Sequence, residues 1–257
     1  MNLETQNHAY WERRAESYSE VNREELAGVQ RTTWKAFLDQ EIMTQFAGRD
    51  RASIRILDLG AGPGFISVVL SELGFQVTAA DQSEQMLLQA KQNAGELAKE
   101  IHFIVADATA PAFDRESFDV IFCRNLTWNL PQPKKAYEAW MKLLTPGGIL
   151  MIFDANWYHY LVDERKKAAY EEDRAAVSAH HLEDYNIGEG FDEMEQIARQ
   201  LPMTDYQRPQ WDVEVLTGLG ATEISVIEDV GALLYSEKEK INYASTPMFY
   251  LRAGRAR

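Results

Sequence analysis

The sequence predicts an α/β fold in which a mostly parallel sheet carries helices on both faces. Short apolar runs alternate with stretches of helix-like apolar spacing up to about residue 154, as expected of successive strand–helix units. Several of these runs end in an acid, and the first leads into three closely spaced glycines. A strand, a glycine turn and a helix in this order are typical of a sheet that binds a ligand at the carboxyl ends of its strands.

The first unit lies at residues 54–65 (IRILDLGAGPGF), where a strand passes into a turn containing Gly60, Gly62 and Gly64. Glycine permits positive φ and removes the Cβ that would hold a ligand away from the main chain. The dinucleotide fingerprint G-x-G-x-x-G is not matched, because Phe65 takes the place of its last glycine. Alone, this loop is equally consistent with a plain tight turn, so the interpretation depends on the segments that follow.

The second and third units each end in an acid. Residues 74–81 (GFQVTAAD) predict a strand whose last residue, Asp81, lies about where a nucleotide-binding unit places a ribose-binding acid. The alternative is that Asp81 caps the helix that follows it. Residues 101–107 predict a strand ending in Asp107, whose carboxylate can accept a hydrogen bond from the amino group of an adenine.

The later units complete the core. Residues 117–125 predict a fourth strand, residues 134–143 a helix, and residues 144–154 a turn and a fifth strand that ends in Asp154. Residues 155–214 follow as an insertion in which acids outnumber lysines and arginines, with helices predicted at residues 164–179 and 191–201.

These segments together resemble the class I S-adenosylmethionine (SAM)-dependent methyltransferases. The resemblance is carried, in the family's order, by residues 57–64 (LDLGAGPG), Asp81, 106–108 (ADA), 118–121 (FDVI) and 144–148 (LTPGG). Residues 220–227 and 248–251 resemble the pair of strands that closes the family's sheet. The resemblance implies a Rossmann-like, seven-stranded, mostly parallel sheet with an antiparallel closing strand, helices on both faces and a helical lid insertion.

The resemblance also implies a division of the chain. Its parts are an N-terminal helical cap at 1–50, a SAM-binding core at 51–154, a helical lid for the substrate at 155–214, and the end of the core sheet at 215–257. A lid suits methyl transfer, because this in-line displacement is helped chiefly by alignment and by the exclusion of water. The alternative for residues 155–214 is an acidic helical bundle that packs its aromatic residues inward.

The resemblance implies a SAM site made of four groups of residues. The methionine part would lie on Asp58, Gly60, Ala61 and Gly62. The adenosine would lie on Asp81, Gln82, Met86, Asp107 and Ala108. Arg124 and Asn125 would lie near the sulfonium and the substrate, and Arg14 and Tyr18 would close over the ligand from the N-terminal helix. The alternative for Arg14 and Tyr18 is packing alone.

Few residues are candidates for catalysis beyond alignment. Asn125 and Trp128 follow the fourth strand, and Trp128 either offers an aromatic face to a cation or packs the strand–helix corner. An acceptor that needs a general base has the candidates His159 and His181, with His180, Tyr158 and Asp154 as further choices. The alternative for these histidines is a place on the surface. No metal is expected, because Arg124 and Asn125 stand where metal-dependent relatives carry an acid.

Composition narrows the class of protein. The net charge of −14 and pI of about 4.8 argue against a nucleic-acid partner, which usually meets a basic face. No apolar run is long enough to span a membrane, and the first residues lack the pattern of a secretory signal, so a cytoplasmic setting is expected. The single cysteine, Cys123, excludes an internal disulfide and is expected to be a small buried hydrophobe.

The sequence therefore predicts a SAM-dependent methyltransferase that acts on a small molecule, of cationic or aromatic character, and releases S-adenosylhomocysteine (SAH). Two alternatives stay open: transfer of another SAM-derived group, and a SAM-binding regulator without turnover. The acceptor atom and the oligomeric state are not indicated.

Overall fold

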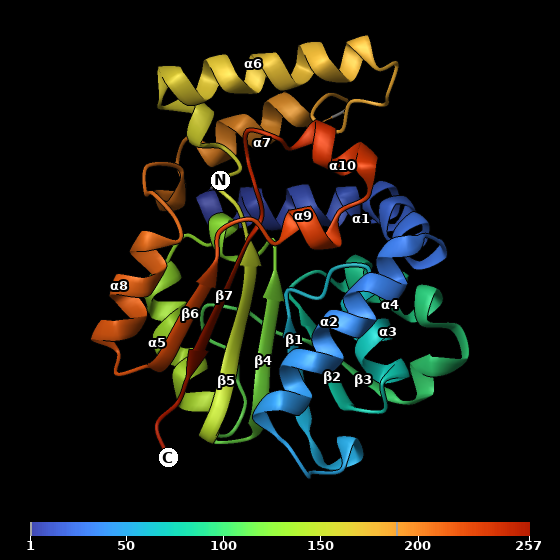
Figure 1. Cartoon of the computed structure of the whole chain (residues 1–257), viewed down its shortest axis with the longest axis vertical. Helices are drawn as coiled ribbons and strands as arrows, with labels where there is room; N and C mark the ends of the chain where they lie inside the picture. The colour runs from blue at the N-terminus through green and yellow to red at the C-terminus, as the bar shows by residue number, and fades with distance from the viewer. Residues whose placement is uncertain (1, 189) are drawn as a thin grey trace.

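The computed structural model describes residues 2–188 and 190–257, and it places one sheet between layers of helices (Figure 1). Among these residues seven strands pair in the order β3-β2-β1-β4-β5-β7-β6. Strands β1 to β5 run parallel, and β7 runs antiparallel to both β5 and β6. The strands are β1 (Arg55–Leu59), β2 (Gln76–Asp81), β3 (Ile101–Val105), β4 (Phe118–Arg124), β5 (Leu144–Asp154), β6 (Thr222–Ile227) and β7 (Phe249–Gly254). The predicted seven-stranded, mostly parallel sheet is confirmed.

Helices cover both faces of this sheet. One hydrophobic core lies between the sheet and α2 and α3, and another between the sheet and α5 and α8. The helices are α1 (Leu3–Ala27), α2 (Val29–Gln45), α3 (Phe65–Glu72), α4 (Glu84–Ala94), α5 (Pro133–Leu143), α6 (Glu164–Ala179), α7 (Phe191–Ala198), α8 (Gln210–Gly218), α9 (Gly231–Leu234) and α10 (Glu237–Asn242). The helix predicted at residues 164–179 is present with those bounds, and the one predicted at 191–201 ends at Ala198.

Side chains that point alternately to the two faces of the sheet contribute to the two hydrophobic cores. On β4, Phe122 faces α2 and α3, whereas Ile121 and Cys123 face α5, because successive side chains of a strand point to opposite faces. Cys123 is buried, and burial raises the pKa of its thiol well above the usual range. It is the buried hydrophobe that the sequence predicts.

The arrangement leaves a crevice at one edge of the sheet. Strand order reverses between β1 and β4, and in open α/β sheets ligands bind outside the carboxyl ends of the strands at this point. Helix α1 lies across these ends, with α6 and α7 beyond it (Figure 1). Of the two long helices in residues 1–50, α1 covers the crevice, whereas α2 packs on the sheet through Trp34, Leu38 and Ile42.

Helix α1 buries mostly polar side chains, which is unusual for so long a helix. Asn2 caps it by accepting a hydrogen bond from the main-chain nitrogen of Thr5 (2.8 Å). Its buried positions include more polar than apolar side chains: Asn7, Ser19, Asn22 and Glu25, beside Tyr10 and Ala15. It packs against α4, and it also contacts α2, α3 and α7. Polar contacts together with the apolar packing of Tyr10 and Trp11 therefore hold α1 over the crevice.

A buried ion cluster joins residues 155–214 to the sheet. The guanidinium of Arg208, fully buried, donates to Asp154 at the end of β5 (2.6 Å) and to Asp212 on α8 (2.8 Å). Tyr137 on α5 also donates to Asp212. Both carboxylate oxygens of Asp154 are used, because they also accept from the main chain of Ala155 and Trp128. Asp154, a candidate base in the sequence, is a structural anchor here.

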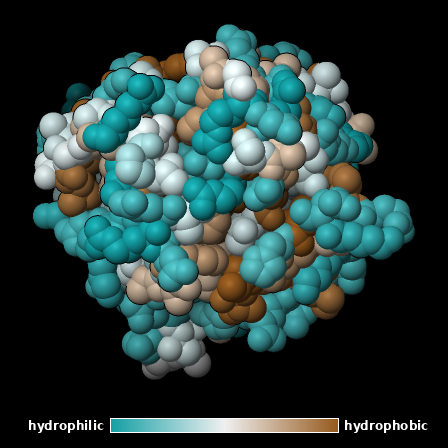
Figure 2. Space-filling model, turned by 90° about the horizontal axis from the view of Figure 1, so that it is seen from below, coloured by the Kyte–Doolittle hydropathy of each residue, from teal (hydrophilic) through white to brown (hydrophobic). Residues whose placement is uncertain are grey.

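The surface away from the crevice is ordinary. Figure 2 shows the lower end of the molecule covered mostly by hydrophilic residues, with hydrophobic ones in small groups. Among residues 2–188 and 190–257, no helix combines the length and the apolar character needed to cross a membrane.

Candidate active site

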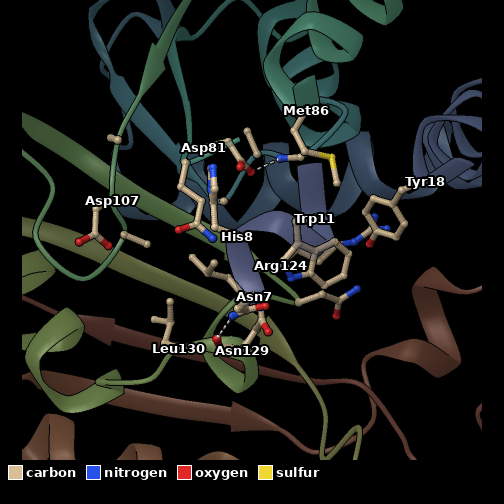
Figure 3. Close-up of a pocket in the computed structure, with 18 of the residues that line it drawn as sticks. Asn7, His8, Trp11, Tyr18, Asp81, Met86, Asp107, Arg124, Asn129 and Leu130 are labelled. Atoms are coloured by element: carbon tan, nitrogen blue, oxygen red, sulfur yellow. Dashed lines mark hydrogen bonds between the residues drawn. The ribbon is translucent and has the colours of Figure 1, made fainter. Parts of the chain in front are cut away.

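A cavity of about 410 Å³ occupies the crevice between the carboxyl ends of the strands and α1. Figure 3 shows side chains converging on it from α1, from the glycine turn after β1, and from the ends of β2, β3 and β4. Most of the residues predicted to bind SAM line it: Tyr18, Asp58, Gly60, Ala61, Gly62, Asp81, Gln82, Met86, Asp107, Ala108, Arg124 and Asn125.

The glycine turn exposes main chain to the cavity. Gly60 and Gly62 both have positive φ, at +70° and +52°. A Cβ on Gly60 would stand 2.7 Å from a methyl carbon of Leu126, so a side chain there would collide with the loop after β4. The turn is bare because both conformation and space require glycine.

Asp81 links the glycine turn to the end of β2. Its carboxylate accepts hydrogen bonds from the main-chain nitrogens of Gly62 and Ser83, each at 2.9 Å. A carboxylate offers about four acceptor positions, so two remain for a ligand in the cavity. Burial raises the pKa of Asp81, while the two main-chain donors oppose that rise. Asp81 lines the cavity and holds the chain just before α4, but the N-cap of that helix is Ser83, not Asp81. The binding of a ribose by Asp81 stays a prediction.

Asp107 and its neighbours form the far side of the same cavity. The carboxylate of Asp107 accepts from the main-chain nitrogen of Thr109 (2.8 Å), which fixes the turn after β3. In Figure 3 Asp107 lies on the side of the cavity opposite Tyr18, with Asp81 between them. The acids at the ends of β2 and β3 thus share one wall.

The other end of the cavity is built around Asp58 and Arg124. Asp58 is buried and accepts a hydrogen bond from the Ser67 hydroxyl (2.5 Å), and burial raises its pKa to about 7. Arg124 donates to Glu25 of α1 (2.6 Å), an ion pair that is mostly buried. The Arg124 guanidinium also lies over the ring of Phe65, 5.2 Å from its centroid.

Unpaired polar atoms gather at this cavity. Most of the buried side-chain nitrogens and oxygens that lack a hydrogen-bond partner in the described part of the chain belong to residues that line it: Asn7 Oδ1, Trp11 Nε1, Arg124 Nη1, Asn125 Oδ1 and Asn129 Oδ1. An unmet buried polar atom costs about 1–3 kcal/mol, so such a concentration is typical of a site shaped for a polar ligand.

Two residues predicted to act at the site lie behind its wall. Trp128 is buried and donates its indole N–H to the carbonyl of Asn125 (2.9 Å), and it packs among aromatic residues outside the cavity. It takes the packing role that was its alternative. Arg14 lies beside Gly190 of the insertion and does not line the cavity.

The two candidate histidines are not brought to the cavity either. His159 Nδ1 lies 2.9 Å from the carbonyl oxygen of Thr204, beside a separate cavity of about 180 Å³. His181 is exposed just after α6, in a left-handed conformation with φ of 52°. Neither histidine lines the cavity at the ends of β1 and β4.

Sequence interpretation missed the contribution of Asn7 and His8. Both line the cavity from α1, together with Glu4, Trp11, Tyr18 and Asn22. The signal was a helical spacing of polar and aromatic residues, since positions 4, 7, 8, 11, 18 and 22 fall on one face of a helix. Residues of this type rarely mark a buried face, so the periodicity is easily overlooked.

Comparisons with known proteins agree with this geometry. Residues 57–152 match the model of a family described as a methyltransferase domain. A ubiquinone biosynthesis O-methyltransferase of Idiomarina loihiensis is 35% identical over 103 residues, which cover 40% of this chain and 42% of that protein. The enzyme of the same name from Xanthomonas oryzae pv. oryzae is 28% identical over 209 residues, or 76% of this chain and 75% of that protein.

A solved structure extends the likeness to the fold. Phosphoethanolamine N-methyltransferase 2 of Haemonchus contortus, in complex with SAM, aligns with a TM-score of 0.55 at 18% identity. The alignment covers 92% of this chain and 60% of that one.

Within the described ranges, no group of three or more histidine, cysteine, aspartate or glutamate side chains is arranged to hold a metal ion.

Proposed function

We propose that this chain, which belongs to the class I SAM-dependent methyltransferases, transfers the methyl group of SAM to a small-molecule acceptor. The observation that carries the proposal is the convergence of the Gly62 main chain, the Asp81 carboxylate and several unpaired polar atoms on one cavity. Main chain laid bare beside a fixed carboxylate suits a nucleoside ligand.

The unpaired atoms suit the charged groups of SAM in particular. Trp11 Nε1 and Arg124 Nη1 are donors that a carboxylate would satisfy, and Asn125 Oδ1 is an acceptor that an ammonium would satisfy. Asp58, at the same end of the cavity, adds a negative charge for that ammonium. We assign the methionine part of SAM to these residues, the ribose to Asp81, and the adenine to the wall formed by Gln82, Met86, Asp107 and Ala108.

Bound SAM supplies an electrophilic methyl group on a sulfonium. The protein's part is to orient the two reactants and to keep water out, which suffices for much of the acceleration of an in-line displacement. Helix α1 covers the ends of the strands and provides Tyr18 and Trp11 as walls. No proton transfer is assigned to His159 or His181, because neither lines the cavity.

The carboxylates and the aromatic ring that line the cavity suit an acceptor with cationic or aromatic character. Glu4, Asp58, Asp81 and Asp107 line the cavity, and its arginine, Arg124, is already paired with Glu25. Carboxylates in a partly enclosed space raise the local concentration of cations, and the ring of Trp11 offers a face on which a cation or a flat ligand can rest.

A labelling experiment tests the proposed function. The protein is incubated with SAM carrying a deuterated methyl group and with a protein-free extract of small molecules, and the products are identified by mass spectrometry. We expect SAH together with an acceptor that carries the intact labelled methyl. Methylthioadenosine instead of SAH would indicate transfer of the aminocarboxypropyl group of SAM, and tight SAM binding without any product would indicate a regulator.

The ionisation of Asp58 predicts a pH dependence of ligand binding. Because the pKa of Asp58 is about 7, its carboxyl is mostly protonated at pH 6 and mostly ionised at pH 8. The ionised form attracts the ammonium of SAH, so the affinity for SAH should rise by about 5- to 10-fold over this interval. Calorimetric titration at several pH values measures the rise. Asp58→Asn should bind weakly and with no such slope, and an equal slope in that variant would contradict the assignment.

A further inference from the structure

The wall of the cavity between α1 and the loop after β4 has a distinct chemistry. Asn7 of α1 and Asn129, at the end of the 3₁₀ turn Thr127–Asn129 after β4, face each other there. Figure 3 shows these two side chains together, away from Asp81, Asp107 and Met86. They therefore lie outside the part of the cavity assigned to the nucleoside.

The orientation of the Asn7 amide is set by a hydrogen bond. Its nitrogen donates to the main-chain carbonyl of Asn129 (3.0 Å), so its oxygen is the atom left for the cavity. That oxygen and the side-chain oxygen of Asn129 are both buried and have no partner. Asn7 is only 3% exposed and Asn129 only 7% exposed, so water does not readily serve either of them.

We propose that this pair of amide oxygens is the acceptor subsite and that it binds the two N–H groups of a primary amine, which is the group that is methylated. The inference rests on the proposed function, and it adds the chemical class of the substrate. An unprotonated primary amine has two N–H donors and one lone pair. Two acceptor oxygens on one wall occupy the donors and leave the lone pair to point away from that wall, toward the rest of the cavity.

The step balances without a further reactant. A primary amine is an ammonium ion in neutral water, so it first loses one proton to solvent. The amine nitrogen then gives its lone pair to form the new N–C bond as the C–S bond breaks, and sulfur keeps the electron pair of that bond. SAM becomes neutral SAH, and the product is a secondary ammonium that loses one proton to solvent. No residue of the protein has to take a proton in the transfer itself.

A hydroxyl acceptor fits the same wall less well. A hydroxyl carries a single proton, so one of the two amide oxygens would stay buried and unpaired. A quaternary ammonium has no N–H and would leave both oxygens unpaired, although its positive charge suits the carboxylates of the cavity. Hydrogen-bond donation, rather than charge alone, is therefore the property that selects the acceptor.

The test uses three probes that share one skeleton: 2-phenylethylamine, 2-phenylethanol and N,N,N-trimethyl-2-phenylethylammonium. Each is titrated by calorimetry into the protein saturated with SAH. We expect the amine to bind at least about 10-fold more tightly than either of the others, and to yield N-methyl-2-phenylethylamine when SAM replaces SAH. Equal affinities, preference for the alcohol or the quaternary ion, or no binding of the amine would overturn the inference. Failure of the protein to bind SAH at all would instead contradict the proposed function.

The variant Asn7→Leu tests whether the Asn7 side chain is responsible for the preference for the amine. Asn7→Leu keeps the approximate size of the side chain and removes the oxygen, so amine affinity should fall about 10-fold while SAH affinity stays within about twofold. The retained SAH affinity also reports that the variant is folded. Glu16→Gln, an exposed change on the same helix, is the matched control and should alter neither affinity. Unchanged amine binding in Asn7→Leu would also overturn the inference.

Discussion

Replacing Asp81 with alanine should weaken SAM binding by about 10- to 100-fold. The carboxylate would supply the acceptors for the ribose hydroxyls, and a hydrogen bond to a charged group contributes about 1.5–3 kcal/mol. The change also frees the main-chain nitrogens of Gly62 and Ser83, which Asp81 holds at 2.9 Å, so the glycine turn loses its support. Isothermal titration of SAM into the purified variant gives the dissociation constant directly.

A matched control separates the ribose contact from general damage. Asp163 also accepts hydrogen bonds from two main-chain nitrogens, those of Arg165 and Lys166 at the start of α6, but it lies outside the cavity. Asp163→Ala removes the same kind of cap and should leave SAM affinity within about twofold. Equal affinities for the wild-type protein and Asp81→Ala would refute the ribose assignment.

Replacing Arg208 with methionine should lower the free energy of unfolding by about 3–5 kcal/mol. Methionine fills a similar volume but leaves Asp154 and Asp212 as buried charges with no cation, which is costly inside a protein. Both carboxylates lie within hydrogen-bonding distance of the guanidinium, and all three side chains are fully buried. Urea unfolding followed by circular dichroism, with the slope compared between variants, measures the loss.

Two comparisons make this result specific. Arg13→Ala removes an exposed ion pair with Glu193 (2.6 Å), and it should change the free energy of unfolding by no more than about 1 kcal/mol. Adding Asp154→Asn and Asp212→Asn to Arg208→Met removes the stranded charges and should recover part of the stability. If the triple variant is no more stable than Arg208→Met, unpaired charge is not the cause of the loss.

The sheet and one wall of the site were predictable because parallel strands obey strong local rules. An apolar run of strand length that ends in an acid places that acid at the carboxyl edge, and the reversal of strand order brings those edges together. Asp58, Asp81 and Asp107 follow this rule, and all three line the cavity. The glycines mark the turn because glycine adopts positive φ most readily, and at Gly60 a Cβ would also collide with Leu126.

The rest depended on contacts that no short pattern encodes. Asp154 also ends a strand, yet it is occupied by Arg208, which lies far along the chain. Trp128 and His159 are held by carbonyl groups of Asn125 and Thr204, and such pairings are set by the path of the loops. The role of Asn7 could not be predicted from the sequence. What marks this residue is that its side-chain oxygen is buried and accepts no hydrogen bond, and only the three-dimensional structure shows this.

One consequence of α1 concerns the way in which each ligand affects the binding of the other. The same helix carries Trp11 and Tyr18, which border the donor end, and Asn7, which borders the acceptor wall. Because both ligands would contact this one helix, whichever binds first would restrict it, and the second would then lose less conformational entropy on binding. We expect each ligand to raise the affinity for the other by the same factor, as thermodynamic linkage requires.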